Sequence, residues 1–130
     1  MKQEPYKLPK SHPRYASLKT RESIAEGVKA GIASLHGLIA HGRGEAFDYL
    51  LGEKTNSSAK GAIKAAAALL LLAKHPVISV NGNAAALVPK ELAELSRLIP
   101  AKLEVSIFHA SKARERKIKT RVAVEGKGGD

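Results

Sequence analysis

Apolar residues recur at helical spacing in the first half of the chain. They predict a helix that Thr20 caps and Gly37 ends, with apolar positions at Ile24, Val28, Ile32 and Leu35. A loop over residues 37–42 then leads into a short second helix over residues 44–51, which Gly52 ends. Before these helices, three prolines predict that residues 1–16 form an extended arm without a helix.

A third helix is predicted in the middle of the chain. Asn56, Ser57 or Ser58 can cap it, and Pro76 prevents its continuation. The stretch from Ala65 to Ala73 is apolar on every side, which is typical of a helix buried on all faces. The pattern therefore predicts that this helix is the hydrophobic centre of the fold.

The second half of the chain alternates between strand and helix patterns. Residues 77–80 predict a strand covered on both faces, and the alternation over 103–107 predicts a second strand. A helix is expected over residues 84–98, and a connection of this length predicts a parallel βαβ unit. We then expect a basic helix over 112–119 and a third strand over 121–124. The fold class is α/β, a helical N-terminal part leading into a parallel sheet that is incomplete in this chain.

Three segments follow from this pattern: a basic arm (1–16), a single domain of helices plus the βαβ core (17–108), and a basic tail (109–130). We interpret the tail as a truncated remainder of the sheet. The net charge of +10 comes mainly from the ends, because residues 1–21 contribute +5 and residues 109–130 contribute +4. Such basic ends can bind polyphosphate, bind nucleic acid non-specifically, or keep a protein soluble.

The composition excludes several kinds of function. Without cysteine there is no disulfide framework, no thiol nucleophile and no cysteine-ligated metal. Two Phe, three Tyr and no Trp offer no platform for stacking bases, so we expect no sequence-specific nucleic-acid partner. The longest apolar run has nine residues, against roughly 20 for a membrane span, and the first ten residues do not resemble a signal peptide. We therefore expect a cytoplasmic protein without a membrane segment.

The densest polar cluster in the domain is the segment His41-Gly42-Arg43-Gly44-Glu45, which lies just before a predicted helix. Glycine backbone, a helix N-terminus and the Arg43 guanidinium could together bind an anion there. The competing interpretation is a glycine-rich turn whose charged side chains are only solvated. The segment lacks the pattern of a P-loop.

Two further segments are candidates. Asn81-Gly82-Asn83 directly follows a predicted strand, where open parallel sheets bind ligands, although a tight turn capped by Asn83 is the more common arrangement. In the basic arm, Arg14 could fold over a phosphate together with Arg21, or the arm could be a disordered tail. His36 and His41 are five residues apart and miss the zinc-site spacing, so we predict no metal site and assign no catalytic residue.

These segments resemble the archaeal 4-phosphopantoate–β-alanine ligases, also called phosphopantothenate synthetases. The similarity runs from about Pro9 to Phe108, and it is carried by four stretches besides the alanine- and leucine-rich helix: Pro9–Tyr15, Thr20–Glu22, Gly37–Leu50 and Val77–Asn83. Members of this family are roughly twice as long, so the chain corresponds to their N-terminal half.

The resemblance implies a homodimeric ligase with a Rossmann-like domain that acts in coenzyme A synthesis. It would condense 4-phosphopantoate with β-alanine at the expense of ATP, through an acyl-adenylate, with Mg²⁺ carried by the nucleotide. By similarity, Arg21 and Arg43 would contact ATP. By position, we add substrate or nucleotide contacts at His41, Gly42, Gly44, Asn81, Gly82, Asn83 and Arg14.

Two other functions remain open from the sequence. One is a non-catalytic protein that binds nucleotide or nucleic acid through its basic ends. The other is a structural half whose sheet is completed by a separately encoded partner.

Overall fold

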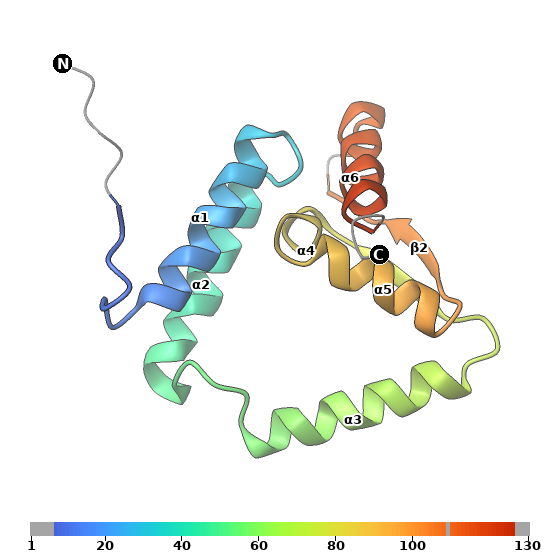
Figure 1. The fold of residues 1–130 in the computed structure, drawn as a ribbon, viewed down its shortest axis with the longest axis horizontal. Coiled ribbons are helices and arrows are strands. Elements are labelled where there is room, and N and C mark those ends of the chain that lie inside the picture. Colours follow the sequence, from blue (N-terminus) through green and yellow to red (C-terminus); the bar gives the residue numbers. More distant parts are fainter. Residues whose placement is uncertain (1–6, 109, 127–130) are drawn as a thin grey trace.

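The computed structural model describes residues 7–108 and 110–126, which contain the following elements. In chain order they are α1 (Tyr15–Lys29), α2 (Leu35–Leu51), α3 (Ser57–Leu72), β1 (Val77–Val80), α4 (Gly82–Leu87), α5 (Pro89–Leu98), β2 (Lys102–Val105) and α6 (Lys112–Glu125). In Figure 1, α1 and α2 lie side by side, α4 to α6 gather around the sheet, and α3 bridges the two groups from below. The predicted α/β class with an incomplete parallel sheet is confirmed.

Helix α1 differs from the prediction at both boundaries, since it ends at Lys29 instead of Gly37, whereas α2 differs only at its start and ends before Gly52 as predicted. Helix α1 begins at Tyr15, so Thr20 lies inside it and donates its hydroxyl to the Ala16 carbonyl instead of capping. Helix α2 is continuous, which makes the predicted loop over 37–42 and the separate helix from residue 44 wrong. Its cap is Ser34, whose hydroxyl accepts from the Gly37 amide at 3.1 Å. Packing against α1 offsets the low helix propensity of the glycines in α2.

Helix α3 begins as predicted but is not buried. The Asn56 side chain accepts from the Ala59 amide at 2.8 Å, which confirms the cap. The apolar side chains stay in solvent, with Leu72 83% and Leu69 70% exposed, so the prediction of a buried centre is wrong. Apolar residues on every side of a helix show that it needs a partner, but they do not show where the partner comes from.

The two strands form the predicted parallel pair. Ile78 lies opposite Leu103 and Val80 opposite Val105. Ile78, Val80 and Val105 face the core, whereas Val77 and Ser79 are exposed on the other side. The expectation that β1 is covered on both faces is therefore wrong, because the described helices cover only one.

The connection between the strands consists of two helices instead of the single one expected. Val88 separates α4 from α5, and Pro89 occupies the first position of α5, where its missing N–H is tolerated. After β2, helix α6 runs through residues 121–124, so the predicted third strand is wrong.

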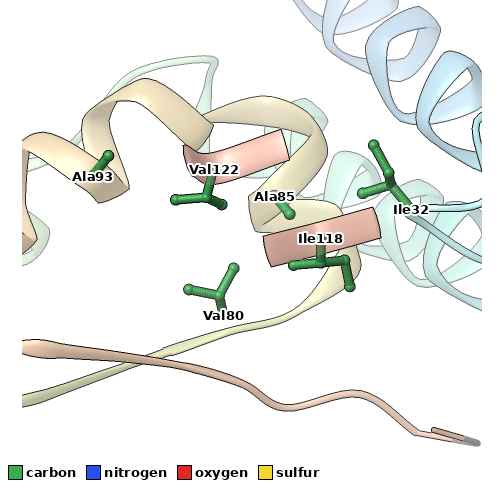
Figure 2. Close-up of a cluster of buried hydrophobic side chains, with 6 residues drawn as sticks. All are labelled: Ile32, Val80, Ala85, Ala93, Ile118 and Val122. Carbon is green, nitrogen blue, oxygen red and sulfur yellow. The ribbon is translucent and has the colours of Figure 1, made fainter. Parts of the chain in front are cut away.

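The core lies between β1, α4, α5 and α6, and it reaches the turn between α1 and α2. Figure 2 shows how the buried side chains converge, and the members of this cluster are Ile32, Val80, Ala85, Ala93, Ile118 and Val122. Ile118 and Val122 belong to α6, so residues beyond 109 contribute directly to the core. No helix among the described residues has the length and apolar character needed to cross a membrane.

Candidate functional site

The segment 41–45 lies in the middle of α2 rather than in a loop before a helix. Backbone amides inside an α-helix are bonded to the preceding turn and cannot bind an anion. The prediction that glycine backbone and a helix N-terminus form the anion site at this segment is therefore wrong. Only the side chains of the segment can carry its chemistry.

Arg21 and Gly42 lie against each other where α1 packs on α2. A Cβ atom added at Gly42 would lie 3.2 Å from Nη1 of Arg21, so the absence of a side chain leaves room for the guanidinium. Arg43 is the next residue of α2 and is exposed. Within the described residues, no ion pair neutralises either arginine. The charge of each arginine is therefore available to an anionic ligand.

His41 and Gly44 occupy different surroundings on α2. His41 is partly buried, and its Nδ1 atom has no hydrogen-bond partner in the structure. Gly44 is exposed, and a Cβ added there would meet nothing within 4 Å. Close approach of a neighbouring segment therefore does not explain glycine at position 44.

The Arg14 guanidinium forms ion pairs with acidic side chains of this chain, so it is not free to pair with a ligand. Its guanidinium lies 3.2 Å from Glu45 and 3.0 Å from Glu53, and it stacks 4.0 Å above the Tyr49 ring. The side chain is only 18% exposed. These contacts tie the start of α1 to the C-terminal part of α2. A ligand contact by Arg14 stays a prediction.

The same contacts change the acidity of Glu45. Burial raises its pKa, but hydrogen bonds from Ser17 and Arg14 and the positive charge of Arg14 outweigh that effect. The pKa of Glu45 therefore lies below its ordinary value of 4.5. The carboxylate stays charged at neutral pH and keeps Arg14 paired.

Asn81, Gly82 and Asn83 form the start of α4 and connect it to the first two helices. Asn81, not Asn83, is the cap, because its side chain accepts from the Ala84 amide at 2.9 Å. The Asn83 amide nitrogen donates to the Gly37 carbonyl of α2 at 2.9 Å. Asn83 thus holds α4 against α2 at the carboxyl end of β1, and the role of the three residues toward a ligand stays a prediction.

Because Gly82 has no Cβ, the start of α4 can lie directly against the backbone of the turn between α1 and α2. A Cβ there would lie 2.6 Å from the Ile32 carbonyl oxygen and 3.3 Å from Nη2 of Arg114. Arg114 was not among the candidates chosen from the sequence. The sequence does not distinguish Arg114 from the other basic residues of α6, because only the fold brings it beside Gly82.

The candidate residues do not line the described pockets. One pocket of about 350 Å³ lies among Leu103, Val105 and Val122, and another of about 550 Å³ lies among Ile32, Lys117 and Val124. Across residues 7–108 and 110–126, no group of three or more His, Asp or Glu side chains is placed to hold a metal ion.

Comparison with known proteins identifies the family. Residues 58–129 match the profile of the phosphopantothenate/pantothenate synthetase family, and this match includes α6, beyond the end of the resemblance noted in the sequence. Three relatives are each named 4-phosphopantoate–β-alanine ligase. The one from Thermococcus kodakarensis is 60% identical over 111 residues, which are 85% of this chain and 42% of the relative. The relative from Methanospirillum hungatei is 63% identical over 107 residues (82% of this chain, 44% of the relative). The Methanosarcina mazei protein is 55% identical over 107 residues (82% of this chain, 42% of the relative).

The chain thus spans less than half the length of the curated relatives it matches. Within that span, more than half of the aligned residues are identical in every case, and the family profile covers more than half of the chain. On these grounds the chain belongs to the phosphopantothenate/pantothenate synthetase family.

Proposed function

We propose that this chain carries part of an ATP-dependent ligase that joins 4-phosphopantoate to β-alanine in coenzyme A synthesis. The observation that supports this most strongly is the 55–63% identity to relatives named for that activity, over more than four-fifths of the chain. The products would be 4′-phosphopantothenate, AMP and pyrophosphate. The cytoplasmic location expected from the sequence stays a prediction.

In the proposed reaction, a carboxylate oxygen of 4-phosphopantoate attacks the α-phosphorus of ATP. The bond from that phosphorus to the bridging oxygen breaks, and pyrophosphate leaves with the electron pair. The amine of β-alanine then attacks the acyl carbon, a C–N bond forms, AMP leaves, and the nitrogen loses a proton. No protein nucleophile is required.

The chain would contribute mainly positive charge and positioning. Arg21 and Arg43 would bind the phosphates of ATP, because neither has an acidic partner among the described residues. Arg21 of α1 rests on Gly42, and Arg43 is the next residue of α2. Fixed cations stabilise the charge that develops on the phosphates as pyrophosphate leaves. Magnesium would arrive on the nucleotide and neutralise further phosphate charge, and we assign no residue to it.

The proposed protein would also be a homodimer. Support comes from the apolar side chains that α3 and the end of α2 leave in solvent, such as Leu50 at 79% and Leu72 at 83% exposure. Exposed apolar patches of this kind are typical of protein–protein interfaces.

An assay for AMP tests the proposed activity. The chain is incubated with ATP, Mg²⁺, 4-phosphopantoate and β-alanine, and AMP is measured by chromatography. We expect free AMP only when ATP, 4-phosphopantoate and β-alanine are all present, because AMP leaves when the amine attacks the acyl-adenylate. If this chain forms no AMP even when mixed with the complementary C-terminal half of a relative, the proposal is wrong.

A further inference from the structure

Arg114 is a half-buried cation without an acidic partner. It lies in the first turn of α6, which follows the second strand of the sheet. Its Nη2 atom donates to the Ile32 carbonyl at 3.3 Å, and its Nη1 atom donates to the Phe108 carbonyl at 3.4 Å. Across the described residues, no carboxylate lies within ion-pair distance of it, in contrast to Arg14.

The guanidinium has donors left over. A guanidinium carries five N–H groups, and the two hydrogen bonds that Arg114 makes to Ile32 and Phe108 are long and have neutral carbonyl acceptors. Its Nε atom is buried and has no partner, so the donors that remain toward a ligand are the second N–H groups of Nη1 and Nη2. A partly desolvated charge with unused donors gains most from an anion, and a phosphate accepts from a guanidinium through two parallel hydrogen bonds.

The position of Arg114 is one where parallel sheets bind ligands. Nη2 would lie 3.3 Å from a Cβ at Gly82, the residue that begins α4 after β1. Arg114 lies in the first turn of α6, the element that follows β2 in the chain. The guanidinium therefore lies outside the carboxyl ends of both strands, which is the usual binding edge of an open α/β sheet.

This edge is also close to the residues proposed for ATP. Asn83 beside Gly82 is bonded to Gly37 on α2, and Arg21 rests on Gly42 of the same helix. Gly37 and Gly42 are five residues apart, or about 7.5 Å along the helix axis. The axial distance is short enough for a ligand to span, and the two positions face about 140° apart around the helix.

We propose that Arg114 binds a phosphate group, and that this group is the phosphate of 4-phosphopantoate. The assignment rests on the proposed function. In that reaction the carboxylate meets the α-phosphorus of ATP, and the phosphate sits at the other end of the same short carbon chain. Arg21 and Arg43 hold the nucleotide, and Arg114 holds the far end of the second substrate.

Calorimetric titration of the 130-residue chain tests this assignment with three ligands: 4-phosphopantoate, unphosphorylated pantoate and ATP. We expect wild type to bind 4-phosphopantoate more tightly than pantoate. Arg114→Gln should lower the affinity for 4-phosphopantoate about tenfold to a hundredfold, because a charge-assisted hydrogen bond is lost. Its affinities for pantoate and ATP should stay within about twofold of wild type. Arg116→Gln, on the exposed side of α6, removes the same charge and should leave all three affinities unchanged.

Arg114 also holds two backbone segments, so Arg114→Lys is the second variant. It keeps the charge but not the paired donors, and its affinity for 4-phosphopantoate should fall between those of wild type and Arg114→Gln. Four results would overturn the inference. Three concern Arg114→Gln: an equal loss of affinity for all three ligands, no loss of affinity, or a loss for ATP alone. The fourth is a wild-type chain that does not bind 4-phosphopantoate. AMP formation that persists in Arg114→Gln with unchanged KM for 4-phosphopantoate would overturn it while leaving the proposed function standing. If the chain binds 4-phosphopantoate through Arg114 but forms no AMP, the proposed function is wrong and the inference about Arg114 stands.

Discussion

Replacing Gly82 by alanine tests the close approach of α4 to the turn between α1 and α2. The added Cβ would lie 2.6 Å from the Ile32 carbonyl oxygen and 3.0 Å from the Ala33 Cα. Both neighbours are backbone atoms, and Ile32 and Ala33 are buried, so the turn must move as a whole. Overpacking of this kind costs about 1–3 kcal/mol.

Gly44→Ala is the matched control. It lies inside α2, and its added Cβ would meet nothing within 4 Å, so it should stabilise the chain by about 0.5–1 kcal/mol through helix propensity alone. Urea unfolding followed by circular dichroism measures both variants. We expect the midpoints to move in opposite directions from wild type. Equal midpoints for Gly82→Ala and wild type would show that the turn does not press on α4, and the geometry around Arg114 would then need revision.

Three other substitutions test separate parts of the structure. Arg43→Ala should weaken ATP binding about tenfold or more, measured by titration calorimetry, because a charge-assisted contact is lost; an unchanged affinity would remove Arg43 from the site. The lowered pKa of Glu45 means that its ion pair stabilises the fold above about pH 4.5 and that this contribution disappears as the pH falls below that value. Wild type should therefore lose more stability than Glu45→Gln between pH 7 and pH 3 in urea titrations, and parallel curves would contradict the assigned pair. Leu72→Lys should leave the thermal midpoint of the fold within about 3 °C, because the side chain is 83% exposed, but it should reduce self-association in light scattering. If the wild type is a dimer and the variant has the same mass, this part of α3 is excluded from the interface.

The local elements were predictable where a single residue type decides them. Asn56 caps α3, Gly52 ends α2, and the β-branched run at 77–80 forms a strand. The pairing of that strand with the next one followed from the length of their connection. These features depend on neighbouring residues, which a sequence displays directly.

The errors arose where contacts between distant segments decide the structure. Three glycines in α2 suggested a loop, but packing against α1 keeps the helix continuous. The β-branched pattern at 121–124 suggested a strand, but Ile118 and Val122 share one helical face that completes the core.

The candidate site was recovered only in part for the same reason. The arginines at 21 and 43 were chosen from the sequence, and the fold packs Arg21 of α1 against Gly42, the residue before Arg43. Arg14 resembled them in sequence but is paired with acids that lie about 30 residues away or farther. Arg114 became visible only when the fold placed it next to Gly82. Charge alone does not separate a paired arginine from an available one.

The one-sided sheet has a practical consequence for handling the isolated chain. The open face of the strand pair is partly polar, since Ser79 donates to Glu104 across it at 3.2 Å and Lys102 is exposed beside them. Water can solvate those groups without a second helical layer. Any self-association of the isolated chain should therefore involve the exposed leucines of α3, and surface engineering for crystallisation belongs on that helix rather than on the strands.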